Sequence, residues 1–465
     1  MPGLFQGLEV GKRALLSHQL WLQTLGHNIA NVNTPGYSRQ RVTVTASRPE
    51  DLSYGSIGTG IQTEDIRHAR DLFLGQQFQL ASKSLGQWTY KQKTMSQIES
   101  IVNEPQDTSL NDLMNQFWDA WSELSTGDAT SSSNRVNVLA RANELVNGIH
   151  VLATRLTSLR DSIDKDLGNF TNQINQMTGD IANLNKQIRA SELGASPAND
   201  LRDARDLLVD QLADLIDVNA HETSDGTMLV SMGSMVLVDG ADQLKLGVET
   251  VNDAGTVTHR LVWDGTSVQL KNLSGQMAGL LESRDKILPD YIAQLNRLTK
   301  TLVEEVNNLH TTGYAVDGTT GIDFFDPNFT DAATVRINNI ILADPEKIVA
   351  SDTAGANNLK IALALSDLRY KAVLEGNSMT MNDYYTSLVG KLGIQSHEAK
   401  SFSGNFELMV QQVDNMRQSV QGVSLDEEMA NMIKYQHAYD AAARVITTMD
   451  QALDTLINGM GVVGR

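Results

Sequence analysis

Hydrophobic residues recur every seven positions at both ends of the chain. Near the C-terminus the repeat has two interleaved lines: Met432, Tyr439, Ile446, Leu453 and Met460, and then Tyr435, Ala442, Met449 and Leu456. Near the N-terminus one line consists of Leu8, Leu15, Leu22 and Ile29, with Leu4 and Leu25 on the alternate line. A strict seven-residue period is typical of the contact line of a coiled coil, because an ordinary amphipathic helix follows a period of 3.6. The pattern predicts two terminal helices that pair with each other or with neighbouring copies of the chain.

The longest helical pattern lies in the middle of the chain, over residues 145–188. Its apolar positions are spaced alternately by three and four residues, which predicts a rod of roughly 66 Å at 1.5 Å per residue. Other helical patterns cover 3–30, 71 onward with a break near Pro105, Ser196-Pro197 to about 217, 277–310, and about 380 to the end. Ser424 and Glu427 predict a capping box at the start of the last helix.

Two regions show strand patterns instead. Residues 40–47 alternate between apolar and polar types, and a second short strand is expected over 61–66. Residues 218–275 combine β-branched side chains with turns at Asp225-Gly226, Asp239-Gly240 and Asp264-Gly265, which predicts a small inserted β domain. Residues 313–350 are expected to form loops and short strands.

The expected fold is mainly α with an inserted β domain, built as a long antiparallel helical bundle with its N- and C-terminal helices paired as a coiled coil. We divide the chain into three parts. The inner terminal coiled-coil domain comprises 1–35 and 425–465. The helical bundle comprises 36–217, 276–310 and 351–424, with a short β region near 40–66. The outward-facing β-rich domain comprises 218–275 and 311–350.

Composition narrows the classes of partner. The formal net charge of −19 argues against nucleic acid, and no apolar run reaches the ~18–20 residues that span a bilayer. The chain has no cysteine, which excludes disulfides, cysteine-ligated zinc and thiol catalysis. The first helix lacks the apolar core and cleavage site of a signal peptide, so if the protein is exported we expect a route that does not cleave a hydrophobic leader.

No arrangement of residues predicts catalysis. The nine histidines are scattered without metal-ligand spacing. Gly459, Gly461 and Gly464 match a dinucleotide fingerprint by letters only, because no strand precedes them and no helix follows. The acidic run Asp426-Glu427-Glu428 is expected in the first helical turn, where the helix dipole favours negative charge. We therefore expect no catalytic residues, no metal, no cofactor and no enzyme activity.

Several segments carry a resemblance to a known family. Residues 25–39 (LGHNIANVNTPGYSR) closely resemble the signature shared by flagellar rod, hook and hook-associated proteins. The segments that resemble the flagellar hook-associated protein 1 (FlgK) family in particular are 199–212, 306–314, 321–325, 382–385, 389–393 and 424–460. The resemblance covers nearly the whole chain, although the compact β region implies that an outer domain of longer relatives is missing.

The resemblance implies a structural junction protein that forms a layer between the hook and the filament of the bacterial flagellum. It implies secretion through the flagellar type III export channel to the extracellular flagellum. The implied partners are other copies of the chain, the flagellar hook protein, the second hook–filament junction protein, and a flagellar export chaperone at the C-terminal helix; nucleic acid and membrane are not among them.

We expect an assembly interface made of the terminal repeats and the loop that follows the first helix. Pro35 favours an extended Thr34, and Gly36 permits a turn with positive φ. The interface residues expected from the repeats are Leu8, Leu15, Leu22, Ile29, Met432, Tyr435, Tyr439, Ile446, Met449, Leu453 and Leu456. Those expected at the helix exit are Asn28, Asn31, Thr34, Pro35, Gly36 and Tyr37.

Two alternatives remain open at this point. One is another flagellar axial protein, although the long helical middle argues against a hook subunit and residues 34–37 (TPGY) argue against a flagellin. The other is a cell-wall hydrolase on an axial scaffold, which the missing carboxylate or metal constellation disfavours.

Overall fold

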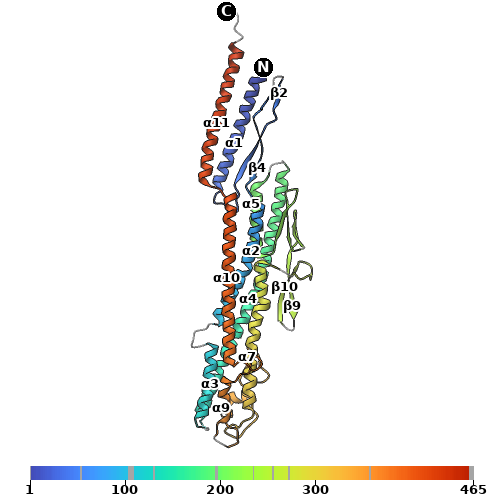
Figure 1. The fold of residues 1–465 in the computed structure, drawn as a ribbon. Helices are drawn as coiled ribbons and strands as arrows, with labels where there is room; N and C mark the ends of the chain where they lie inside the picture. The colour runs from blue at the N-terminus through green and yellow to red at the C-terminus, as the bar shows by residue number, and fades with distance from the viewer. Residues whose placement is uncertain are drawn as a thin grey trace, which may run out of the picture.

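The computed structural model describes residues 2–52, 55–102, 109–128, 131–193, 197–233, 235–253, 256–270, 273–355 and 358–459. Long helices lie almost parallel to one axis, and both termini lie at the same end of the rod (Figure 1). The fold class expected from the sequence is confirmed, with helices dominating and the β strands gathered in small sheets.

The helices are α1 (Pro2–Ala30), α2 (Leu72–Val102), α3 (Leu110–Thr126), α4 (Ser132–Glu192), α5 (Asn199–Leu215), α6 (Gly275–Glu282), α7 (Leu288–His310), α8 (Asn339–Ala343), α9 (Lys360–Asp367), α10 (Met381–Gln421) and α11 (Leu425–Asp454). Five-residue π-helical segments follow α6 (Ser283–Ile287) and α11 (Thr455–Gly459), and short 3-10 turns cover Pro345–Lys347 and Leu368–Tyr370. The strands are β1 (Gln40–Ala46), β2 (Glu50–Leu52), β3 (Gly55–Ile57), β4 (Ile61–His68), β5 (Asn219–Glu222), β6 (Met228–Met232), β7 (Met235–Asp239), β8 (Asp242–Gln243), β9 (Leu246–Asp253) and β10 (Thr256–Trp263).

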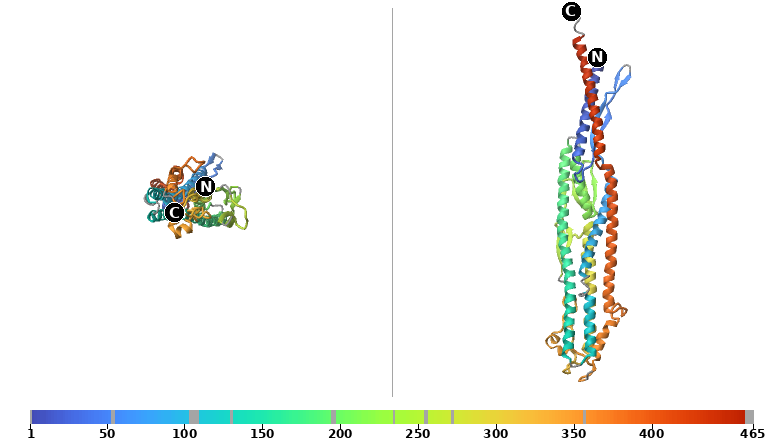
Figure 2. Two further views of the ribbon diagram at one scale, coloured as in Figure 1. Left: turned by 90° about the horizontal axis from the view of Figure 1, so that it is seen from below. Right: turned by 90° about the vertical axis from the view of Figure 1, so that its left-hand side faces the viewer.

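The rod has a thin end and a thick end, which we call the neck and the body. The neck consists of α1, α11 and strands β1–β4, and the body contains the remaining elements (Figure 2). Within the body the chain runs away from the neck in α2 and α3, returns in α4, descends again through α5 to α7, and returns in α10. This path makes the bundle antiparallel.

The β region near 40–66, which the expected division grouped with the helical bundle, lies against α1 in the neck. β1 and β4 form an antiparallel ribbon that packs along α1. Ser17 and Thr63 share a hydrogen bond of 3.1 Å, and Arg13 donates to Ser47 at 2.6 Å. The glycine-rich loop between these strands contains the short hairpin β2–β3. The sequence shows that these strands exist but not which helix they pack against.

Helix α4 is the backbone of the body and is longer than its apolar pattern alone indicated. It has 61 residues, about 92 Å at 1.5 Å per residue, and begins where Ser131 accepts the amide of Asn134. Its buried positions keep the expected spacing through Leu145, Ile149 and Leu156. The first turns continue the same spacing through the buried residues Arg135, Val138 and Ala142, so packing extends the helix beyond the expected stripe.

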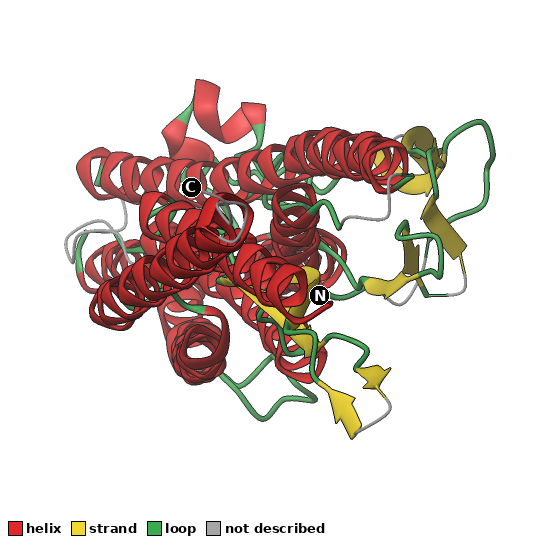
Figure 3. Cartoon of the chain, turned by 90° about the horizontal axis from the view of Figure 1, so that it is seen from above, coloured by secondary structure: helices red, strands yellow, loops and turns green. Residues whose placement is uncertain are grey.

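The inserted β region is confirmed over 219–263 and divides into two parts. Strands β5–β8 form a four-stranded antiparallel sheet, while β9 and β10 form a separate ribbon. Seen along the rod, the strands lie at the rim of the helices (Figure 3). The expected turns contain Gly226, Gly240 and Gly265 at positive φ. Two asparagines of α4 fasten these strands to the bundle. Asn185 bonds Met228 and Gly240, and Asn175 exchanges two bonds of 2.8 Å with Leu246.

Residues 311–350 do not join that β region, contrary to the expected third domain. In the part of the chain that is described, they form isolated bridges, one α-helix and one 3-10 turn rather than strands. They pack on the opposite half of α4, where Arg135 donates to Ile348 O and His150 bonds Val335 O. Since Asn175 lies 25 positions beyond His150, about 37 Å separates the two attachment levels.

A cluster of aromatic rings closes the far end of the body. Phe117, Trp121 and Phe324 pack with ring centroids 5.5–6.2 Å apart, and all three are fully buried. His310 joins them: its Nε2 accepts the Val349 amide at 2.9 Å, so its Nδ1 donates to Ile322 O at 2.6 Å. Burial lowers the pKa of His310 to about 4, so the ring is neutral in the folded protein.

Candidate assembly site at the neck

Helices α1 and α11 form an antiparallel pair with one continuous register. Gly7 faces Met449, Gly11 faces Ile446, Trp21 stacks on Tyr435 with ring centroids 4.5 Å apart, and Asn28 bonds Glu428 at 2.9 Å. A Cβ added to Gly7 or Gly11 would lie 2.9 or 2.8 Å from the opposing side chain. The two glycines therefore allow the helix axes to approach closely.

The seam of α11 lies where the repeat placed it. Met432, Tyr435, Tyr439, Ile446, Met449 and Leu453 are all partly shielded from solvent, as is Leu456 in the following π-helical segment, and Ala442 is buried. Met460 lies outside the described residues. The packing observed is within one chain; a role of these residues between subunits stays a prediction.

The seam of α1 is displaced by one residue from the expected line. The residues that meet α11 include Gly7, Trp21 and Asn28, each one position before Leu8, Leu22 and Ile29. One residue turns the helix by about 100°. Leu8, Leu15, Leu22 and Ile29 are thus partly shielded on the flank of the pair. Hydrophobic periodicity counts Trp21, but it does not count the glycines and the asparagine that share the contact line with it, so the leucine repeat gave the stronger pattern.

Asn28 organises the exit from α1. Its amide nitrogen donates to Gln40 O at 3.0 Å and to Glu428 at 2.9 Å, and its amide oxygen accepts from the Tyr37 hydroxyl at 2.7 Å and from Gln40 N at 2.9 Å. All four hydrogen-bonding positions of a side chain that is 1% exposed are occupied. Burial, and then the negative charge of nearby carboxylates, raises the pKa of Tyr37, so the hydroxyl stays protonated and can donate.

The other loop residues shape the turn. Asn31 accepts hydrogen bonds from Thr34 through both its backbone and its side chain. Gly36 has φ +78°, and a Cβ added there would lie 2.9 Å from Cβ of Leu207. The expectation of a positive-φ turn at Gly36 is confirmed, and the structure adds a close approach to α5. Pro35 has a trans peptide bond, as do the other residues of the described chain.

An ionic clasp joins the loop to the start of α11. Arg39 is bidentate to Glu427 at 2.9 and 3.0 Å and approaches Glu428 at 2.6 Å, while its amide donates to Gln421 O at 2.8 Å. Burial opposes the charge of Arg39, but Glu427 and Glu428 outweigh it and raise its pKa. The hydrogen bond from Arg39 lowers the pKa of Glu427.

The clasp corrects two expectations. Ser424 makes no side-chain cap bond, and the carboxylate of Glu427, the other half of the expected capping box, is bound to Arg39 instead. Glu428 is fully buried, so the acidic run does more than complement the helix dipole. Sequence reasoning missed Arg39, Glu427 and Glu428 as contact residues; the available signals were the arginines at 39 and 41 and the acidic run at 426–428.

The first two turns of α5 contact the loop that follows α1 and the strand that ends at His68. Asp203 accepts the Ser38 amide at 2.8 Å and contacts His68 at 2.9 Å, and Asp206 pairs with Arg70. Asp200 accepts from Gln40 at 2.7 Å. These aspartates recur every three residues and so occupy neighbouring positions on the helix. The acidic segment 199–212 thereby positions the neck on the body.

A cavity of about 1070 Å³ lies at this junction, lined by the loop and by α2, α4, α5 and α10. Its charged groups are largely paired, as in Arg417 with Asp210 at 2.7 Å. Within the described residues no group of histidine, aspartate or glutamate side chains is arranged to hold a metal ion. The same portion of the chain contains no helix long and apolar enough to cross a membrane. The site is an arrangement of packing and ion pairs, suited to holding helices in place.

Comparison with known proteins identifies the family. Residues 95–325 match the helical domain of the flagellar hook-associated protein FlgK, and residues 417–459 match the C-terminal region of the flagellar basal body rod FlgEFG proteins. The flagellar hook-associated protein 1 of Bacillus subtilis (strain 168) is 33% identical over 100% of both chains. The chain belongs to the FlgK family. The Escherichia coli (strain K12) protein of the same name is 26% identical, over 95% of this chain and 97% of its own.

A solved structure supports the fold. The flagellar hook junction protein FlgK from Burkholderia pseudomallei superposes with a TM-score of 0.64 at 16% identity, covering 74% of this chain and 100% of that one. FlgK-family proteins are structural components of the flagellum, at the junction of hook and filament. The rod-type match over 417–459 coincides with the end of α10 and with α11. The family assignment favours the junction protein over a hook subunit or a flagellin.

Proposed function

We propose that this FlgK-family chain forms a layer between hook and filament by packing its neck against the necks of neighbouring copies. The observation that carries the proposal is the apolar surface of the neck. Phe5, Leu16, Met429, Ile433 and Ile457 are 56–70% exposed, although each would gain free energy on burial. A pair of helices leaves much of its apolar surface in water, and neighbouring copies would cover it.

The expected interface residues fit this proposal in two ways. The α11 repeat, with Tyr435, Ile446 and Met449, holds the helix pair together within a chain. The displaced α1 repeat, with Leu8 and Leu15, lies on the flank of the pair, where an adjacent subunit can reach it. We assign the first group to pairing within the chain and the second to contact between chains.

The remaining partners follow from the position of a junction layer. The hook protein would contact one side of the layer and the second junction protein the other. An export chaperone would bind α11, whose side chains are largely exposed outside the seam. Export through the flagellar type III channel to the cell exterior agrees with a chain that has no cysteine to cross-link. We further propose that the chain has no catalytic activity.

The test is complementation of a strain that lacks its own junction protein. A chain without residues 2–30 and 425–459 should give bare hooks, located by electron microscopy with antibody labelling. A control deletion limited to residues 251–258, which spares the buried Leu246, Leu261 and Trp263, should leave the junction and the filament intact. Normal filaments on hooks that carry the chain without its terminal helices would refute the proposal. Peptidoglycan cleavage by the purified chain would refute its non-enzymatic part.

A further inference from the structure

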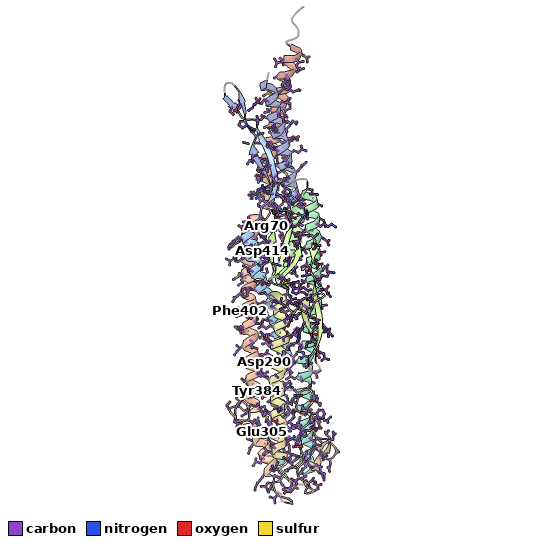
Figure 4. The ribbon with its side chains drawn as sticks, turned by 90° about the vertical axis from the view of Figure 1, so that its right-hand side faces the viewer. Arg70, Asp290, Glu305, Tyr384, Phe402 and Asp414 are labelled. Atoms are coloured by element: carbon purple, nitrogen blue, oxygen red, sulfur yellow. The ribbon has the colours of Figure 1, made fainter. Side chains whose placement is uncertain are left out.

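The cavity of about 1070 Å³ at the junction separates part of the neck from the body. On the neck side it is lined by loop residues 32–38 and by Gly422 and Val423, and on the body side by α2, α4, α5 and α10. Arg70 and Asp414, which both line it, lie just below the neck in Figure 4. A cavity holds one water molecule at ~10–15 Å³. This one is therefore a wide gap between neck and body, and not a packed interface.

Beside the gap, the first turns of α5 bind the neck through polar contacts. Asp200 contacts His27 at 3.1 Å, and Asp203 accepts the Ser38 amide at 2.8 Å. Of the described residues of α5, those that line the cavity begin at Asp206. The neck is thus supported at the start of α5, and the gap opens next to that support.

Two segments of the chain cross between neck and body, residues 69–71 and 422–424, and both are described and non-helical. Helix α10 ends at Gln421 and α11 begins at Leu425, with Gly422 in an extended conformation at φ −69° and ψ 150°. A continuous helix would hold the two parts in line. Short non-helical segments can absorb changes in φ and ψ, which is how hinges work.

Apolar side chains line the gap on both of its sides. They include Val32, Pro35 and Val423 of the neck, and Phe78, Phe170 and Met177 of the body. Bringing the two groups together would remove apolar surface from water. The two arginines of the lining are already paired, Arg70 with Asp206 and Arg417 with Asp210, so no unpaired positive charge on them opposes closure. Closure is favoured by the apolar lining and resisted by the polar contacts with α5.

We propose that the neck tilts on the body about the first turn of α5, and that this tilt opens and closes the cavity. Residues 69–71 and 422–424 are the two hinges. The tilt is a property of the single chain and goes beyond the proposed function, which concerns contacts between chains. It allows copies with one sequence to differ in the angle between neck and body.

The first experiment measures the tilt by double electron–electron resonance between two spin labels on a dilute monomeric sample. Because the chain has no cysteine, Gln19→Cys on α1 and Gln187→Cys on α4 place one label on the neck and one on the body, both at exposed positions. The control pair, Gln187→Cys with Asn415→Cys on α10, lies entirely within the body. The neck–body pair should give a distance distribution at least about twice as wide as that of the control pair. Equal widths in the two pairs would overturn the proposal.

The second experiment tests whether the cavity provides the room for the tilt. Gln173 of α4 is exposed and lines the cavity, so Gln173→Trp should place a bulky ring in the gap without disturbing the circular dichroism of the chain. The neck–body distribution should then narrow toward the width of the control pair. Asn172→Trp, at the neighbouring exposed position outside the lining, should leave the distribution as wide as in the parent. A Gln173→Trp chain with the parent's width, or equal narrowing in both variants, would show that closure of the cavity is not the motion.

These outcomes are independent of assembly. Bare hooks in the complementation test would leave the measured tilt unchanged, and a rigid neck would leave the proposed junction layer unchanged. The two proposals can therefore fail separately.

Discussion

Replacing Glu428 with glutamine should loosen the neck without unfolding the body. Glu428 is fully buried between Arg39 at 2.6 Å and Asn28 at 2.9 Å. Glutamine keeps the shape and can still accept from Asn28. Its amide group then faces the guanidinium of Arg39, which has lost one of its two negative partners.

The expected loss of free energy depends on which contacts of Arg39 remain after the substitution. Removing one partner of a buried ion pair costs about 3–5 kcal/mol. Arg39 keeps its bidentate bonds to Glu427, whose side chain is 56% exposed and partly screened. We therefore expect a loss of about 2–3 kcal/mol in the free energy of opening the joint between loop and α11. Amides that exchange through this opening should exchange about 30- to 150-fold faster, at 1.36 kcal/mol per tenfold change.

Hydrogen–deuterium exchange at neutral pH measures the free energy of opening this joint. The informative amides are those of Arg39, bonded to Gln421 O, and of Glu428, bonded to Ser424 O. The matched control, Glu427→Gln, removes the exposed partner and should cost less than about 1 kcal/mol. Amides in the middle of α4 serve as an internal reference. Equal exchange rates in the two variants, or a larger effect of Glu427→Gln, would show that the reasoning about burial is wrong.

Three further predictions concern other parts of the rod. Gly36→Val places a β-branched residue at φ +78° against Leu207 and should lower the free energy of unfolding in urea by more than about 2 kcal/mol. The control Gly26→Ala lies in open space on a helix and should raise that free energy slightly. Equal behaviour of the two variants would contradict the argument about the turn. Gly11→Val should push α11 away and speed amide exchange along it, since the added Cβ would lie 2.8 Å from α11; unchanged exchange would mean that the glycine is not needed. His310, with its pKa lowered to about 4, contributes stability that is full above pH ~6.5 and is lost as the pH falls through 4. The loss is about 3 kcal/mol between pH 7 and 4. A His310→Gln chain with the same acid sensitivity as the parent would contradict that assignment.

Whether the seven-residue repeat predicted the contact line of a terminal helix correctly depended on which residues that helix places on the line. The α11 seam was predicted correctly because its large apolar residues occupy both lines of the repeat. The α1 seam was misplaced because its true contact line contains Gly7, Gly11 and Asn28. Close approach and hydrogen bonding select those residues, and a count of hydrophobic positions cannot detect either.

The sequence by itself determined the helical class, the inserted β strands, the turn at Gly36 and the family. Each depends on local backbone preference or on a contiguous motif. Only the tertiary structure decided which segments meet: β1–β4 on α1, residues 311–350 at the far end, and Arg39 on Glu428 across 389 positions. Such contacts are set by the three-dimensional path of the chain. A charged or apolar side chain can form an ion pair or a packing contact only when that path brings a partner close to it.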